Sequence, residues 1–191
     1  MAELKRLPRL EELGLYGTIL TESGWAHLAA VRNLRHLELR GVEAPDGWEH
    51  MRGLTQVQSL AVHTTPDTDL AAVGSLRNLQ ELSLDFPLTD QQIAHLERLA
   101  NLRVLSLGGL EDGPAALRRL TGLRELELSF GVRDSWLALI EEMKGLKKIV
   151  LDRYSGTPSQ IEALRSARPD LEVVFEEPGG GGLGGGGGGA L

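Results

Sequence analysis

The chain has 191 residues, of which 41% are hydrophobic, 25% charged and only 4% aromatic, a composition typical of one soluble domain with a leucine-based core. Its formal net charge of −7 argues against nucleic acid as a partner, because phosphate binding depends on clustered lysine and arginine. There is no cysteine, and no apolar stretch approaches the roughly 18 residues of a membrane-spanning helix, so we expect no membrane partner and a cytoplasmic location.

The first ten residues, MAELKRLPRL, lack the apolar centre of a signal peptide. Leu4 and Leu7 align with Leu96 and Leu99 of a later segment, which places them in the helical half of a repeat whose strand is missing. Two explanations stay open: these residues form an abbreviated terminal cap, or the chain was cut from a longer protein.

One nine-residue pattern occurs seven times, as in LRHLELRGV from Leu34 to Val42. Its copies begin 21 to 24 residues apart, which is typical of a repeat protein. Within a copy, apolar residues alternate with outward ones, and this alternation predicts a half-buried strand. The copies begin at Leu10, Leu34, Val57, Leu79, Leu102, Leu123 and Leu146, and a frayed eighth begins at Leu171.

The segments between the predicted strands are amphipathic and predict helices. In TDQQIAHLERLAN, for example, Ile93 and Leu96 recur at helical spacing. Thr89 followed by Gln92 predicts a capping box at the start of this helix, and Thr157 followed by Gln160 predicts another. Alternating strands and helices of this length make neighbouring strands parallel, and each repeat leans on the next.

This pattern resembles the leucine-rich repeat family over about residues 4 to 176. The stretch TILTESGWAHL is similar to bacterial repeats of about 23 residues that are related to the ribonuclease-inhibitor-like class. The resemblance implies a curved, horseshoe-like α/β solenoid over residues 1–177, with a parallel β-sheet on the concave face and helices on the convex face. It also implies a module that binds a protein or peptide on the concave sheet.

Two parts of the chain depart from regular repeats. Residues 178–191 contain ten glycines, so we expect a flexible tail, with recognition by a partner or a processing enzyme as the alternative. The position after each strand that often carries Asn or Cys in the family is irregular, so we expect no regular polar ladder there and uneven repeat packing. Its occupants are Thr18, Val42, Thr65, Pro87, Leu110 and Gly131.

Residue types that carry chemistry are present but badly placed for it. His27, His50 and His95 recur in helical segments, and helices of adjacent repeats stand about 8 to 10 Å apart, too far for one zinc ion. Outward carboxylates recur at the same strand position without forming a close pair, at Glu12, Glu81 and Glu125. Tryptophans at inward positions are assigned to the core: Trp25, Trp48 and Trp136.

A serine, a histidine and an aspartate also occur on neighbouring strands. Ser83 and Asp85 lie two residues apart on one strand, however, and together with His63 they have no oxyanion hole and no nucleophile turn. We therefore predict no enzymatic activity, no metal site and no cofactor.

The predicted binding site consists of outward strand residues and the residues just after the strands. Aromatic and arginine side chains are enriched among binding hot spots, so Tyr16, Arg40, Phe86, Phe130 and Arg153 are the expected anchors. The full predicted set is Tyr16, His36, Glu38, Arg40, His63, Asp85, Phe86, Phe130, Asp152 and Arg153. The predicted function is binding of a protein or peptide; the alternative is a sensing or regulatory segment of a larger enzyme or signalling protein.

Overall fold

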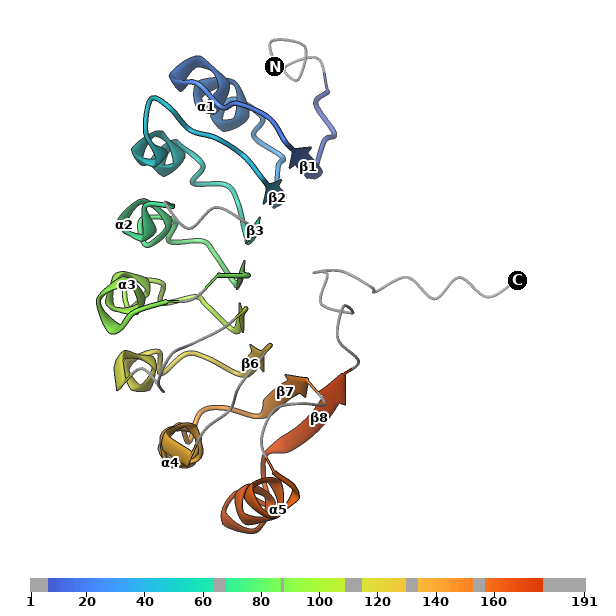
Figure 1. The fold of residues 1–191 in the computed structure, drawn as a ribbon. Helices are drawn as coiled ribbons and strands as arrows, with labels where there is room; N and C mark the ends of the chain where they lie inside the picture. The colour runs from blue at the N-terminus through green and yellow to red at the C-terminus, as the bar shows by residue number, and fades with distance from the viewer. Residues whose placement is uncertain are drawn as a thin grey trace.

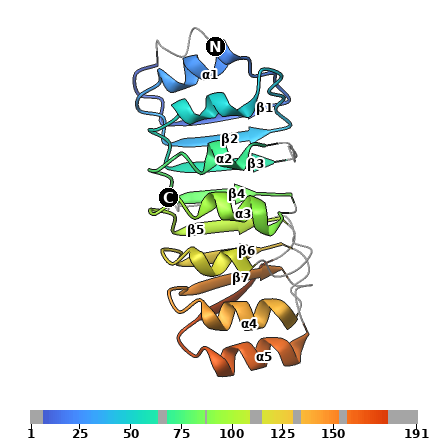
Figure 2. The ribbon, with the colours of Figure 1, turned by 90° about the vertical axis from the view of Figure 1, so that its left-hand side faces the viewer.

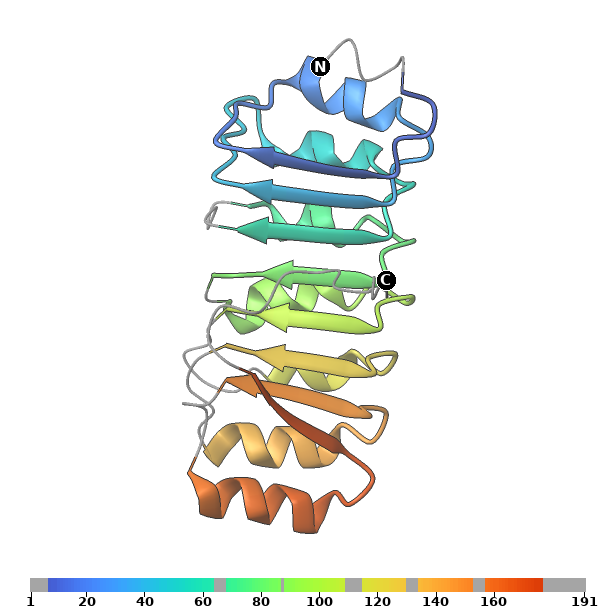
Figure 3. The same cartoon turned by 90° about the vertical axis from the view of Figure 1, so that its right-hand side faces the viewer.

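The structure is a computed structural model that describes residues 7–63, 68–86, 88–108, 115–129, 134–152 and 157–176. Eight parallel strands form one sheet in sequence order, as the repeats predict, and the frayed eighth copy supplies the last strand (Figure 3). The strands are β1 (Glu12–Tyr16), β2 (His36–Arg40), β3 (Ser59–His63), β4 (Glu81–Leu84), β5 (Val104–Leu107), β6 (Glu125–Leu128), β7 (Lys148–Asp152) and β8 (Glu172–Glu176).

The helices cover the convex side of the curved sheet (Figures 1 and 2). They are α1 (Glu22–Ala29), α2 (Leu70–Val73), α3 (Asp90–Leu96), α4 (Asp134–Glu142) and α5 (Pro158–Ala167). Two repeats differ from the expected α-helix and carry 3₁₀ helices instead, η2 (Trp48–Gly53) and η3 (Ala115–Arg119). Before η2, Pro45 and then Gly47, at a φ of 99°, keep the chain out of helical geometry.

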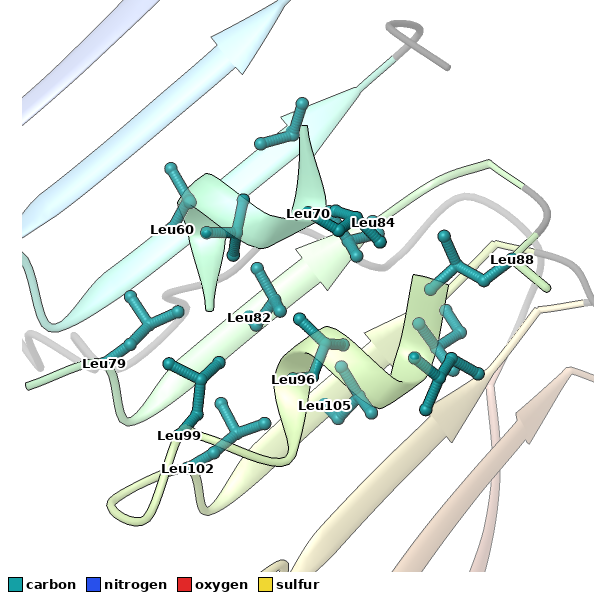
Figure 4. Packing of buried hydrophobic residues seen from close by; sticks show 14 of the residues in the cluster. Leu60, Leu70, Leu79, Leu82, Leu84, Leu88, Leu96, Leu99, Leu102 and Leu105 are labelled. Carbon is teal, nitrogen blue, oxygen red and sulfur yellow. The ribbon is translucent and has the colours of Figure 1, made fainter. Parts of the chain in front are cut away.

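The core lies between the sheet and the helices and consists mainly of leucine. Leu60, Leu82 and Leu105 occupy matching positions on β3, β4 and β5, and all three are fully buried with Leu96 of α3 (Figure 4). The three tryptophans are buried as predicted, and the rings of Trp25 and Trp48 pack with centroids 5.6 Å apart. No repeat buries its leucines alone, so each depends on its neighbours.

Both predicted capping boxes are confirmed. The backbone N–H of Gln92 donates to Thr89 Oγ1 (3.3 Å), and the N–H of Thr89 donates to Gln92 Oε1 (2.9 Å). Thr157 and Gln160 make the same two bonds at the start of α5. These bonds satisfy amide groups that have no partner within the helix.

A polar ladder that the sequence analysis missed joins the turns that precede the strands. Asn78 Nδ2 donates to the carbonyl of Thr55 (2.8 Å), and Asn101 Nδ2 donates to that of Arg77 (2.9 Å), each bond reaching into the preceding repeat. Farther along, Arg124 Nη1 donates to the carbonyl of Gly145 in the next repeat (2.7 Å). The signal in the sequence is the NLR, NLQ or GLR that precedes β2, β4, β5 and β6, whereas the family pattern directs attention to a position after the strand.

Arg168 is a buried residue that links the last helical repeat to the one before it by hydrogen bonds. Its guanidinium is almost fully buried and donates to the carbonyls of Ile140 (3.0 Å), Met143 (3.2 Å) and Leu146 (2.9 Å), at the end of α4 and beyond. Asp170 accepts from Arg168 Nε at 2.8 Å, and this bond holds the pKa of the Asp170 carboxyl well below its usual range. The buried cation is therefore fully hydrogen-bonded, as its burial requires.

The two ends of the solenoid differ. At β1 the inward Leu13 and Leu15 are only half-buried, and Leu7, expected to match the buried Leu99, is 48% exposed. At β8 the guanidinium of Arg165 lies 5.9 Å from the ring centroid of Phe175 and shields part of its surface. Leu4 and the glycine-rich tail lie outside the described residues. None of the described helices is long and apolar enough to span a membrane.

Candidate binding surface on the concave sheet

The concave face of the sheet carries outward side chains in regular rows, as strand alternation predicts. The middle row pairs across seven strands, and its members are Gly14, Glu38, Ala61, Ser83, Ser106, Glu127 and Val150. In the part of the chain that the structure describes, every helix lies on the opposite side (Figure 1). This face is therefore a broad parallel sheet, although Ala61, Ser83 and Val150 of the middle row are buried.

Five of the predicted site residues form a polar network across β1 to β4, consisting of Tyr16, Glu38, Arg40, His63 and Asp85. The hydroxyl of Tyr16 donates to Glu38 Oε2 at 2.8 Å. The other carboxylate oxygen of Glu38 lies 3.5 Å from Arg40 Nη2 and 3.8 Å from His63 Nε2. Glu38 thus connects side chains from three strands.

His63 lies between two carboxylates in this network. Its Nδ1 is 3.1 Å from Asp85 Oδ2, and its side chain is only 9% exposed, in contrast to the 37% of Asp85. The neighbouring outward residues Ala61 on β3 and Ser83 on β4 are also buried. The imidazole is therefore part of the floor of the site, and the other four network residues are more accessible.

Tyr16 is held in a defined orientation at the edge of the network. A Cβ atom built on Gly14 would lie 2.7 Å from Tyr16 Cε2 and from the Tyr16 hydroxyl oxygen, so the Tyr16 side chain lies over the glycine, and it is 60% exposed. The hydrogen bond to the Glu38 carboxylate raises the pKa of the Tyr16 hydroxyl above its ordinary value of 10.0, and burial adds to this effect. Arg40 opposes the shift by its positive charge. The phenol is therefore neutral and donating at physiological pH.

A hollow of about 480 Å³ opens on the concave face beside this network. Gly14, Ser59 and Ala61 have small or absent side chains and form its floor. The larger side chains around it come from the first four strands and include Glu12, Tyr16, His36, Glu38, His63 and Glu81. His36 was predicted as a site residue, whereas Glu12 and Glu81 were considered only as outward carboxylates that do not form a close pair.

The far half of the sheet contributes less to the candidate site. Lys148 Nζ and Glu125 Oε1 form an ion pair at 2.7 Å, which joins β6 to β7. The backbone of Asp152 pairs with Glu176 at the end of β7. The side chain of Asp152, and the predicted anchors Phe130 and Arg153, lie outside the described residues. The same holds for Thr65, Pro87, Leu110 and Gly131.

The expectation that Phe86 is an exposed anchor is wrong. Phe86 is 4% exposed and belongs to the same core cluster as Leu84 and Leu88. The physical reason is parity: Phe86 continues the inward series of Leu82 and Leu84 two residues beyond the strand. Its ring consequently stabilises the turn and is not offered to a partner.

A metal site would require clustered ligand side chains, and a serine nucleophile would require an accessible serine. Within them, no group of three or more histidine or acidic side chains has an arrangement that could hold a metal ion. Ser83, the serine considered as a nucleophile, is only 7% exposed on β4. The contact between His63 Nδ1 and Asp85 Oδ2 holds the imidazole in the polar network.

A one-sided parallel sheet built from repeats of 21 to 24 residues defines a leucine-rich repeat protein. No family model and no curated protein matches the sequence, but solved structures match the fold. Internalin C2 from Listeria monocytogenes has a TM-score of 0.56 at 21% identity, over 87% of this chain and 80% of that chain. The chain thus has the leucine-rich repeat fold.

Two further solved structures show the same likeness with longer chains. The leucine-rich repeat protein LIC12759 of Leptospira interrogans has a TM-score of 0.57 at 20% identity, over 92% of this chain and 51% of that chain. An internalin, inlF, from Listeria monocytogenes has a TM-score of 0.51 at 15% identity, over 91% of this chain and 56% of that chain. The present chain therefore spans little more than half the length of these two proteins.

Proposed function

We propose that this chain is a protein-interaction module that holds a protein or peptide segment on its concave sheet and has no catalytic activity of its own. The observation that carries the proposal is the polar network, in which Tyr16, Glu38 and Arg40 project from adjacent strands beside an open hollow. Tyrosine and arginine are frequent binding hot spots because they combine apolar area with hydrogen-bonding groups.

The size of the sheet supports a slender partner. Eight strands about 4.8 Å apart span about 34 Å, and a strand of four residues is about 13 Å long. The projected area is about 440 Å² on these spacings, whereas a standard interface takes about 800 Å² from each partner. A peptide segment or a single helix matches the sheet, and a larger partner must also contact the loops.

Site-specific photo-cross-linking in a lysate of the source organism tests the proposal. A benzophenone side chain placed at Ser106, an outward position on β5, is expected to form covalent adducts with a partner. The matched control carries the same group at Glu162, which is exposed on α5 on the convex side. Adducts formed from Glu162 but not from Ser106 would contradict a concave binding face.

A further inference from the structure

The hollow over β1 to β4 carries negative charge that the described residues neutralise only in part. Among its described lining residues there are three glutamates and no lysine or arginine. Glu38 is engaged with Tyr16 and Arg40, but Glu12 and Glu81 make no hydrogen bond or ion pair within the described part of the chain. In contrast, Glu125, at the same position on β6, is paired with Lys148.

The Tyr16 ring adds a second feature that favours a cation. The ring lies across Gly14, which is two residues from Glu12 on the same face of β1 and therefore about 7 Å away. Tyr16 is 60% exposed, so a cationic side chain that pairs with Glu12 can also contact the ring, since ring faces attract cations. The hydrogen bond to Glu38 keeps the ring in this orientation before any partner arrives.

We propose that the bound segment of the partner is extended and positively charged, an inference that rests on the proposed function. Two of its arginine or lysine side chains, four residues apart, pair with Glu12 and Glu81. These glutamates occupy equivalent positions on β1 and β4, so three strand spacings, about 14 Å, separate them. In an extended chain, residues four apart lie on one side and about 13 Å apart. An extended segment that crosses the strands therefore matches both carboxylates.

Charge complementarity also selects against other occupants of the hollow. An acidic segment would be repelled by three carboxylates, and a neutral apolar segment would remove Glu12 and Glu81 from water without supplying partners. In an α-helix, residues four apart rise only about 6 Å, too little to reach from β1 to β4. Two cations four residues apart therefore reach both carboxylates in an extended segment and not in a helical one, which needs about nine or ten residues for about 14 Å.

The proposal is tested by titrating the full chain with the peptide acetyl-Gly-Arg-Ser-Gly-Ser-Arg-Gly-amide at low salt. Isothermal calorimetry measures the affinity, and NMR shifts of backbone amides report the location. We expect this peptide to bind about threefold more tightly than an isomer with adjacent arginines, and a citrulline analogue to show no binding. Shifts should concentrate in β1 to β4. Equal affinity for both arginine isomers would overturn the two-point pairing.

A charge-matched pair of variants separates the site from the general acidity of the chain. Glu12→Gln with Glu81→Gln is expected to weaken binding of the spaced peptide about tenfold. Glu49→Gln with Glu162→Gln removes the same charge from exposed positions outside the concave sheet and should leave the affinity unchanged. An equal loss in both variants would show that only non-specific attraction is at work.

Failure of this inference can be distinguished from failure of the proposed function. The comparison uses the protein with benzophenone at Ser106, with and without the Glu12→Gln/Glu81→Gln substitutions. If both forms capture the same partner equally, the proposed cationic segment is wrong and the concave binding face stands. If Ser106 yields no adduct, the proposed function fails, and the peptide titration still decides whether the hollow binds paired cations.

Discussion

Glu38 is the residue on which the polar network of the concave face depends. It accepts a hydrogen bond from Tyr16 and lies close to both Arg40 and His63, so its removal disturbs contacts on three strands. Tyr16 in turn is oriented by Gly14, where a side chain would occupy the place of the ring. A site of this kind is preorganised, and it loses less side-chain entropy on binding than a set of free side chains.

The titration of Tyr16 tests the hydrogen bond to Glu38. In a Tyr154→Phe background, Tyr16 is the remaining tyrosine, and its phenolate absorbance should appear at a pKa above 10.0. Glu38→Gln should lower this pKa toward 10.0, because the carboxylate that favours the protonated phenol is gone. Glu12→Gln, the control, should leave it unchanged. Identical titrations of the Glu38→Gln protein and the control would contradict the bond.

The same shift has a defined effect on stability. Because the folded-state pKa of Tyr16 is raised, the folded protein holds this proton more tightly than the unfolded chain does. The stabilisation is complete below about pH 10, the pKa of an unperturbed tyrosine. It is lost as the pH rises from there through the folded-state pKa.

At the scale of elements, the distance between adjacent helices limits what the repeats tolerate. Gly74 ends α2, and a Cβ atom there would lie 2.2 Å from the carbonyl oxygen of His95 in α3. At Gly53, the end of η2, a Cβ atom would lie 3.4 Å from the Cβ of Ala29, an ordinary contact. The two glycines therefore occupy similar places in their repeats and differ in the room around them.

This difference predicts that the fold tolerates an alanine at Gly53 but not at Gly74. Gly74→Ala should lower the free energy of unfolding by about 2 kcal/mol, because the backbone of α3 must move. Gly53→Ala should change it by no more than about 0.5 kcal/mol, since the clash is absent and alanine favours helix. Urea denaturation followed by circular dichroism measures both, and a Gly53→Ala loss as large as that of Gly74→Ala would refute the packing argument.

At the scale of the whole molecule, the protein is a linear stack in which each repeat is supported only by its neighbours. Central leucines such as Leu82 are fully buried, whereas Leu13 of β1 is half-buried because no strand lies beyond it in the described sheet. The C-terminal repeats are strengthened by Arg168, which hydrogen-bonds three carbonyls of the adjacent repeat. Stability is therefore expected to be lowest at β1.

Two equivalent leucine truncations measure this gradient. Leu82→Ala should reduce the free energy of unfolding by about 3 kcal/mol, because it opens a cavity in the centre of the stack. Leu13→Ala, which removes the same atoms from an equivalent strand position, should cost about 1 kcal/mol. Hydrogen exchange should also be faster for the amides of β1 than for those of β4. Equal costs at both positions would mean that the first repeat is as well supported as the centre.

The repeat pattern by itself determined the strands, their order and the leucines that fill the core. The 21-to-24-residue period sets the repeat, and alternation assigns each strand residue to the core or the concave face, so both are local properties of the chain. The rows on the concave face followed from the same rule, including the places of Tyr16, Glu38 and Arg40. The two capping boxes were equally local, and both were predicted.

Only the tertiary structure decided which of these residues act together. The Tyr16–Glu38 bond joins residues 22 apart in the sequence, and the buried contacts of Arg168 reach back 22 to 28 residues, so both depend on how repeats stack. Phe86 became core because inward parity persisted beyond β4, where the sequence shows only an aromatic residue in a turn. Likewise, the repeats place Glu12 and Glu81 at the same strand position, but only the structure shows that both border one hollow.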